Sequence, residues 1–288
     1  MEAKKIIVDN KKKKNIKKLI TNTVIYFILL TVALSMLIPF IWMVSTSLMN
    51  DLEVYQFPPK FIPSKFLWSN YPNALKALPF DRFFFNTTIT TIFVTMGQLF
   101  FCSMAAYAFS RIKFPGRDKL FMLYLSTMMV PGVVTLIPSF IIINNFGWID
   151  TFWALIIPLL SNVWGIFLLR QFFMTIPLSL SDSARIDGAS EFTIYLKIII
   201  PLSKPALATL GVFTLMGTWR ALLWPLIVTR SMKMRTIEVG ISAFHSLYVT
   251  NWPYQMSAAV VAMIPILIFF FFAQKYFVEG IALTGMKG

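Results

Sequence analysis

Acidic and metal-binding side chains are scarce in this sequence of 288 residues. It contains 12 Asp and Glu, one His and one Cys, against 26 Lys and Arg. Cys102 lies inside an apolar run, so there is no disulfide framework, and His245 has no Cys, Asp or Glu nearby in the sequence to complete a ligand set. We therefore predict no metal site and assign both residues to packing or to the surface.

Charge as a whole is scarce as well. Charged residues make up 13% of the chain, about half the usual quarter, and apolar residues make up 57%, above the roughly 45–50% of soluble domains. This composition indicates a polytopic membrane protein. The net charge of +14 would suggest a nucleic-acid partner in a soluble chain, but the cations cluster at the ends of apolar runs, so we predict no nucleic-acid partner.

Six charge-poor runs are long enough to cross a bilayer core of about 30 Å. They cover residues 23–46, 82–111, 119–150, 150–170, 204–228 with an interruption at position 220, and 257–276. Prolines inside the last four runs predict broken helices, which are tolerated where neighbouring helices or a cavity satisfy the freed carbonyls; these are Pro131, Pro138, Pro158, Pro225 and Pro265. The predicted fold class is an all-α membrane protein with six transmembrane helices.

Lys and Arg residues are distributed unequally between the two ends of these spans. Eighteen lie on the side of both termini and of the loop 170–204, and eight lie on the other side. Because cytoplasmic ends carry the excess of cations, both termini are predicted to be cytoplasmic. We read 1–22 as a basic cytoplasmic tail followed by an uncleaved first span, 23–278 as the membrane domain, 279–288 as a short cytoplasmic tail, and 47–82 as an exposed extended segment with one short helix.

A polar stretch over residues 181–191 interrupts the second half of the chain. Ser181 is expected to cap a short helix, and Gly188 to end it in the left-handed conformation that glycine adopts at low cost. Asp187 lies in the last turn, where the helix dipole disfavours a carboxylate. We therefore expect Asp187 to accept N–H groups across the corner and to lock the bend.

A second short helix is predicted directly after this corner. Ser190 can cap it, and Pro201 can end it or begin the next element. Its apolar residues recur at i, i+3, i+4 and i+7, which places them on one face, with Lys197 behind; they are Phe192, Tyr195, Leu196 and Ile199.

The residues 182–189, followed by 199–205, resemble the EAA loop of ABC importer permeases, whose pattern is Glu-Ala-Ala-x-x-Asp-Gly-Ala with a proline about a dozen residues on. This chain departs from the pattern where Asp182 replaces Glu and Ser183 replaces the first Ala. Further short motifs are similar to the carbohydrate-importer branch, and within it to the smaller of the two maltose-type permease subunits; they occupy 42–48, 105–111, 114–117, 169–173, 276–280 and 284–288.

The resemblance implies a type I importer permease fold in the cell membrane and a cytoplasmic coupling loop over 173–200. It implies that the loop residues contact ATPase subunits; these are Asp182, Ser183, Ala184, Asp187, Gly188, Ala189 and Glu191. Gly285 and Lys287 of the C-terminal tail are expected to reach the same subunits. The implied partners are a second homologous permease, two copies of the ATPase, an external solute-binding protein and the lipid bilayer, with ATP and Mg²⁺ held by the ATPase and no catalytic residue or bound cofactor in this chain.

The fifth span departs from the family sequence Trp-Asn-x-Phe-x-Trp-Pro. Arg220 stands where Asn is usual, roughly 24 Å along the helix from Lys204 at about 1.5 Å per residue, near the predicted outer interface. It can reach water or pair with another residue, or it can meet passing substrate together with Trp219 and Trp224. These three residues are the substrate-path candidates.

The sequence holds no energy source of its own. It has no Gly-x-x-x-x-Gly-Lys-Ser/Thr phosphate loop, and no Asp or Glu lies in the charge-free runs to relay protons. A secondary transporter is thereby disfavoured, and the polar corner argues against a passive channel or a structural scaffold. The function implied is half of the translocation pathway of an ATP-driven sugar or oligosaccharide importer; a permease of the same fold for a non-sugar solute is the alternative.

Overall fold

The computed structural model describes the backbone of residues 2–245 and 250–285, and side chains within 18–245 and 250–274. The described residues form helices and contain no β-strand, which confirms the all-α class. The chain divides into two compact units, one of residues 1–72 with 251–260 and one of residues 73–250 with 261–288. Each is described by itself.

The first unit contains α1 (Glu2–Ser47), α2 (Asp51–Val54) and the beginnings of α3 (Asn70–Ala77) and α15 (Trp252–Gly285). α1 continues without a break from the basic segment into the apolar run. The segment that follows α1 is fixed by buried polar contacts: the Asn70 side-chain amide donates to the carbonyls of Ser47 (2.9 Å) and Met49 (2.8 Å), and Glu53 accepts the N–H of Ser64 (2.7 Å). The prediction of one short helix in residues 47–82 is therefore wrong, because two helices, α2 and α3, form there.

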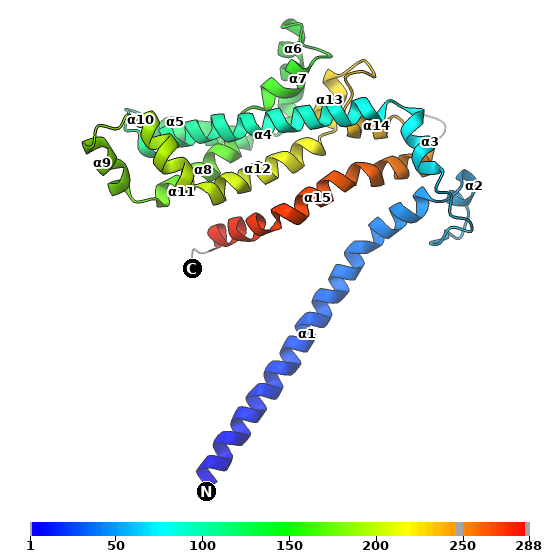
Figure 1. Ribbon diagram of the computed structural model, residues 1–288, viewed down its shortest axis with the longest axis horizontal. Coiled ribbons are helices and arrows are strands. Elements are labelled where there is room, and N and C mark those ends of the chain that lie inside the picture. The colour runs from blue at the N-terminus through cyan, green and yellow to red at the C-terminus, as the bar shows by residue number, and fades with distance from the viewer. Residues whose placement is uncertain (1, 246–249, 286–288) are drawn as a thin grey trace. The chain divides into compact units, whose positions relative to one another are not determined.

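The second unit is built on α4 (Phe80–Arg111), which packs along α8 (Val163–Thr175) and α12 (Lys204–Trp219) (Figure 1). Their shared apolar core includes Cys102, Leu169 and Leu210, all with no exposed surface. Gly97 allows the close approach of a neighbouring segment, since a Cβ there would lie 2.2 Å from the Leu160 side chain.

Smaller elements complete this unit. They are α5 (Arg117–Ser126), the 3₁₀ turn η1 (Thr127–Met129), α6 (Gly132–Asn145), α7 (Phe152–Ile156), the 3₁₀ turn η2 (Ile157–Leu159), α9 (Leu178–Ile186), α10 (Glu191–Ile194), the π-helical turn η3 (Tyr195–Ile199), α11 (Ile200–Leu202), α13 (Leu223–Val228) and α14 (Ile237–Ser242). α13 packs on α6 and α7, and α14 packs on α4.

Four of the described helices are long and apolar enough to cross a membrane, and the number rises to six if each of two bent pairs counts as one span. One bend, of 101°, separates α5 and η1 from α6 at Val130 and Pro131; the other, of 80°, precedes α12. The expected break at Pro131 is thus present. Pro138 and Pro265 lie inside α6 and α15, which continue through them, so the breaks expected there are absent.

The fourth span is interrupted between η2 and α8, directly after Pro158, and buried amides hold the interruption. The Gln98 side-chain N–H donates to the carbonyl of Leu159 (2.8 Å), while its oxygen accepts hydrogen bonds from Thr214 (2.7 Å) and from the amide of Asn162. Asn162 also caps α8 by accepting the N–H of Gly165 (2.6 Å). Three helices therefore meet at one polar joint, which satisfies a carbonyl that the break sets free.

Candidate functional site

The polar stretch 181–191 forms a sharp corner between α9 and α10. α9 ends at Ile186, and Gly188, whose φ is +82°, turns the chain just after it. The closing bonds run from the Gly188 N–H to the Arg185 carbonyl (3.0 Å) and from the Ala189 N–H to the Ala184 carbonyl (2.9 Å). These two bonds are the Schellman arrangement of a helix end. Nothing lies within 4 Å of where a Gly188 Cβ would be, so the position requires glycine for its backbone conformation and not for space. The predicted helix stop is confirmed.

The two expected helix starts have different outcomes. Ser190 caps α10, because its hydroxyl accepts the N–H of Thr193 (3.2 Å), as predicted. Ser181 does not cap α9, which already begins at Leu178 after Pro177. The prediction for Ser181 is wrong because Pro177 can start the helix: it lacks only an N–H that a first turn leaves unpaired in any case. Ser181 is instead fully buried in the second turn, and its hydroxyl has no hydrogen-bond partner among the described residues.

Arg185 holds the corner together. Its Nη1 lies 2.7 Å from Asp182 Oδ1 on the same helix, and its Nε lies 2.7 Å from Glu191 Oε1 on the next helix. Sequence reasoning missed this residue, although its spacing of three from Asp182 was a usable signal.

Asp187 does not lock the bend as expected. It is exposed, and its carboxylate makes no hydrogen bond or ion pair with the described residues. Asp187 takes part only through its backbone, as the last residue before Gly188. Ser183 is also exposed, and among the described residues its hydroxyl donates only to the carbonyl of Leu180 on its own helix (3.3 Å). Asp187 and Ser183 therefore both present their side chains to the surroundings.

The apolar face predicted for the second helix is divided by the π-helical turn at Tyr195–Ile199. Tyr195 and Ile199 are buried, whereas Phe192 and Leu196 are 56% and 45% exposed. Ile186, just before the corner, is 87% exposed. The corner therefore presents apolar side chains next to polar ones, which is typical of a docking surface.

Three hydrogen-bonding groups fasten this segment to α4. The Tyr107 hydroxyl donates to Glu191 Oε2 (2.5 Å), and the Ser103 and Tyr195 hydroxyls lie 2.7 Å apart. Arg111 donates through Nη2 to the carbonyls of Phe173 and Ile176, at the end of α8 and the start of the loop. None of these contacts was predicted, because the partners are far apart in the sequence.

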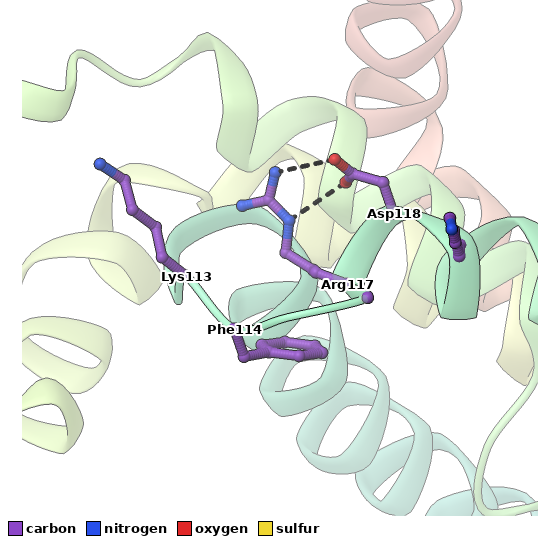
Figure 2. A pocket seen from close by; sticks show the side chains of 6 residues that line it. Lys113, Phe114, Arg117 and Asp118 are labelled. Carbon is purple, nitrogen blue, oxygen red and sulfur yellow. Dashed lines mark hydrogen bonds and ion pairs between the residues drawn. The ribbon is translucent and has the colours of Figure 1, made fainter.

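A basic hollow lies between the end of α4 and the start of α5. Figure 2 shows Lys113 and Arg117 beside it, with the Arg117 guanidinium paired to Asp118 (3.1 Å from Nε to Oδ1). Asp118 also pairs with Arg170 of α8 (3.3 Å), and Arg170 lies over the ring of Phe121 at 4.1 Å. This pairing joins α5 to α8 beside the corner segment.

The substrate-path candidates do not form one group. The Trp219 indole is 8% exposed and donates to the carbonyl of Ala262 (3.2 Å), and the Trp224 indole donates to the carbonyl of Ala154 (2.9 Å). Both polar groups are thus already used in packing. Arg220 directly follows α12 and has an exposed side chain. Burial raises the pKa of Glu238, and the positive charge of Arg220 opposes that shift. Their roles toward substrate stay predictions.

The remaining predicted residues lie at the end of the chain. Gly285 is the last residue of α15, and Lys287 lies outside the described residues. Within the described side chains, no three His, Cys, Asp or Glu come together as a metal site. The exposed apolar and polar side chains of the corner suit docking to a partner.

Broken apolar spans joined to a polar corner are the arrangement expected of the membrane subunit of a transport system. Residues 98–282 match the family model described as binding-protein-dependent transport system inner membrane component, and the chain belongs to this family. It is a multi-pass membrane component of a transport system and not an enzyme, as the sequence predicted.

Curated relatives extend the match. The chain is 38% identical over 207 residues to the arabinooligosaccharides transport system permease protein AraQ of Bacillus subtilis (strain 168), covering 72% of this chain and 74% of AraQ. It is 32% identical over 277 residues to the sn-glycerol-3-phosphate transport system permease protein UgpE of Rhizobium meliloti (strain 1021), covering 93% and 98% of the two chains.

Among solved structures, the chain is similar to a bacterial ABC transporter involved in the import of the acidic polysaccharide alginate. The TM-score is 0.79 and the identity 27%, with 90% of this chain and 96% of that chain covered. The predicted type I permease fold is thereby confirmed. The orientation of the termini stays a prediction.

Proposed function

We propose that this chain is one of two permease subunits in an ATP-driven importer that carries an oligosaccharide across the cell membrane. A second homologous permease completes the pathway, two copies of an ATPase bind ATP and Mg²⁺ in the cytoplasm, and an external solute-binding protein delivers the substrate. This chain contributes no covalent chemistry. Its part is to alternate between inward-open and outward-open states when the ATPase dimer closes.

The corner between α9 and α10 is the observation that carries this proposal. Its shape is set in advance by Gly188 and by the Arg185 ion pairs, whereas Ile186 and Phe192 remain exposed. A preformed corner that exposes apolar groups suits docking to a partner that pushes it as a rigid piece.

The oligosaccharide assignment is supported by what the relatives are named for. AraQ is named for arabinooligosaccharides, and the similar solved structure belongs to an importer of a polysaccharide. UgpE is named for sn-glycerol-3-phosphate, which is not a sugar. This relative therefore supports the alternative, a permease for a non-sugar solute.

Coupling is tested by replacing Gly188 in the complex purified with its ATPase subunits and reconstituted into lipid. Gly188→Val should abolish the stimulation of ATP hydrolysis by loaded binding protein, because a β-branched residue at φ +82° costs about 1–2 kcal/mol and deforms the corner. Gly217→Val is the matched control, since Gly217 is exposed, has a helical backbone and has open space around its Cβ position. Normal stimulation in Gly188→Val would remove the corner from the mechanism.

The substrate is tested by uptake in intact cells. Arabinotriose, an alginate trisaccharide and glycerol-3-phosphate are supplied separately, with and without the chain. We expect chain-dependent uptake of an oligosaccharide; chain-dependent uptake of glycerol-3-phosphate alone would establish the alternative.

A further inference from the structure

One face of α4 carries three polar residues at successive turns. Ser103, Tyr107 and Arg111 are spaced four residues apart, so they lie one above another on the helix. All three are buried, with 1%, 5% and 5% of their surface exposed. A buried row of this kind on an otherwise apolar helix needs partners, because an unpaired polar group in such surroundings is costly.

The partners of this row are the two ends of the corner segment. Arg111 holds the carbonyls of Phe173 and Ile176 before α9, and Tyr107 holds Glu191 after the corner. Tyr195, the partner of Ser103, follows one turn later. Any displacement of the corner therefore strains contacts on a single helix.

The other end of α4 is fastened to a different segment. The Asn86 amide donates to the carbonyls of Lys233 (2.8 Å) and Arg235 (2.9 Å), and the Thr87 hydroxyl accepts the N–H of Ile237 (2.9 Å). Gly240 of α14 lies so close to Phe83 that a Cβ would come within 2.2 Å of the ring. Residues 233–240 are thus attached to the first turns of α4 by both polar and packing contacts.

The two attachments lie about one membrane thickness apart. The 21 residue steps from Asn86 to Tyr107 correspond to about 32 Å at 1.5 Å per residue, against a bilayer core of about 30 Å. α4 contains no proline over its 32 residues. α8 and α12, which pack on it, have 13 and 16 residues, about 20 and 24 Å, and each begins at a break or a bend.

We propose that α4 is the rigid link that transmits movement of the α9–α10 corner to residues 233–240, with the Tyr107–Glu191 and Asn86–Lys233 hydrogen bonds as its two end attachments. The proposal rests on the proposed function, since it assumes that an ATPase moves the corner. Tyr107 and Asn86 are positioning residues, because they act by fixing α4 to the corner and to residues 233–240.

The test places a nitroxide label on Lys233→Cys and follows its mobility by electron paramagnetic resonance in the reconstituted complex. The Lys233 side chain is exposed, and Cys102 is buried and should not be labelled. A non-hydrolysable ATP analogue with Mg²⁺ is the probe. Tyr107→Phe keeps the ring and removes only the hydroxyl; Asn86→Leu removes the other attachment at similar volume.

Tyr124→Phe is the matched control, because Tyr124 packs against the same core and its hydroxyl makes no hydrogen bond with the described residues. We expect Tyr107→Phe and Asn86→Leu to reduce the nucleotide-dependent change at position 233 about fivefold or more, the lower range of allosteric couplings, while the ATPase subunits still co-purify. Tyr124→Phe should respond like the parent.

A full response in Tyr107→Phe would overturn the link while leaving the proposed function intact. An unmodified complex in which nucleotide does not change the mobility of the label at position 233 would also overturn the link, and the ATPase stimulation and uptake tests would still decide the proposed function. If Asn86→Leu does not assemble, Tyr107→Phe alone gives the decision.

Discussion

Arg185 binds Glu191 across the corner with two parallel hydrogen bonds, 2.7 Å from Nε to Oε1 and 3.3 Å from Nη2 to Oε2. The same carboxylate accepts the Tyr107 hydroxyl. Glu191 is therefore the point at which the corner is both closed on itself and attached to α4. The angle between α9 and α10 depends on a charge pair that spans the glycine and not on the aspartate beside it.

Replacing Arg185 should loosen the corner, and replacing Asp187 should not. Arg185→Gln removes ion pairs that are partly exposed and worth no more than about 1 kcal/mol, which corresponds to about fivefold faster amide hydrogen exchange over residues 188–194. Asp187→Asn should leave exchange unchanged, because its carboxylate has no partner in the described chain. Faster exchange in Asp187→Asn, with Arg185→Gln silent, would reverse the assignment.

The amide joint at the fourth span should be sensitive to loss of Gln98. Gln98→Leu leaves the Leu159 carbonyl, the Asn162 amide and the Thr214 hydroxyl without their partner, at a cost of about 2 kcal/mol. We expect a lower unfolding temperature of the detergent-purified protein. Thr95→Val on the same helix is the control; the buried Thr95 hydroxyl has no hydrogen-bond partner among the described residues, so this change should be neutral or slightly stabilising. Equal unfolding temperatures for Gln98→Leu and the parent would show that the joint does not hold the break.

Arg220 is expected to act on its neighbourhood and not on substrate. Burial raises the pKa of Glu238, and the charge of Arg220 opposes that rise. Arg220→Lys keeps the charge and should leave this pKa and uptake unchanged, whereas Arg220→Asn removes the charge and should raise the pKa further. Uptake of neutral and acidic oligosaccharides at matched expression is the measurement. A loss of acidic substrates alone in Arg220→Asn would show that Arg220 meets the substrate.

The orientation of the chain is open to direct test. Cysteines at positions 13 and 288 should be protected from an impermeant maleimide in intact cells, and one at position 65 should be labelled, because the cations favour cytoplasmic termini. The native Cys102 is buried and should give no background. Labelling at 288 without permeabilisation would refute the six-span topology.

Local signals in the sequence were sufficient for much of this site. Gly188 and Ser190 could be placed because a left-handed helix end and a hydroxyl cap depend on the residue itself and its immediate neighbours. Ser181 misled because Pro177, four residues earlier, offers an equally good helix start. The sequence alone does not distinguish a serine that caps a helix from a serine that is buried inside one.

The long-range contacts could not be read in this way. Tyr107 and Glu191 are 84 residues apart, and Gln98 and Thr214 are 116 apart, so their pairing depends on how α4 packs in three dimensions. The division of the apolar face between Tyr195 and Leu196 was equally hidden, because periodicity assumes 3.6 residues per turn.

The π-helical turn at Tyr195–Ile199 sets the direction in which the corner faces. The Ile200 N–H reaches back five residues to the Tyr195 carbonyl, so this turn holds one residue more than an α-helical turn would. Deleting the exposed Leu196 would restore ordinary winding and rotate everything before it by about 100° relative to α12. Ile186 and Phe192 would then point to a different side of the molecule, so the direction of the proposed docking would depend on the number of residues in the helix as well as on the side chains it displays.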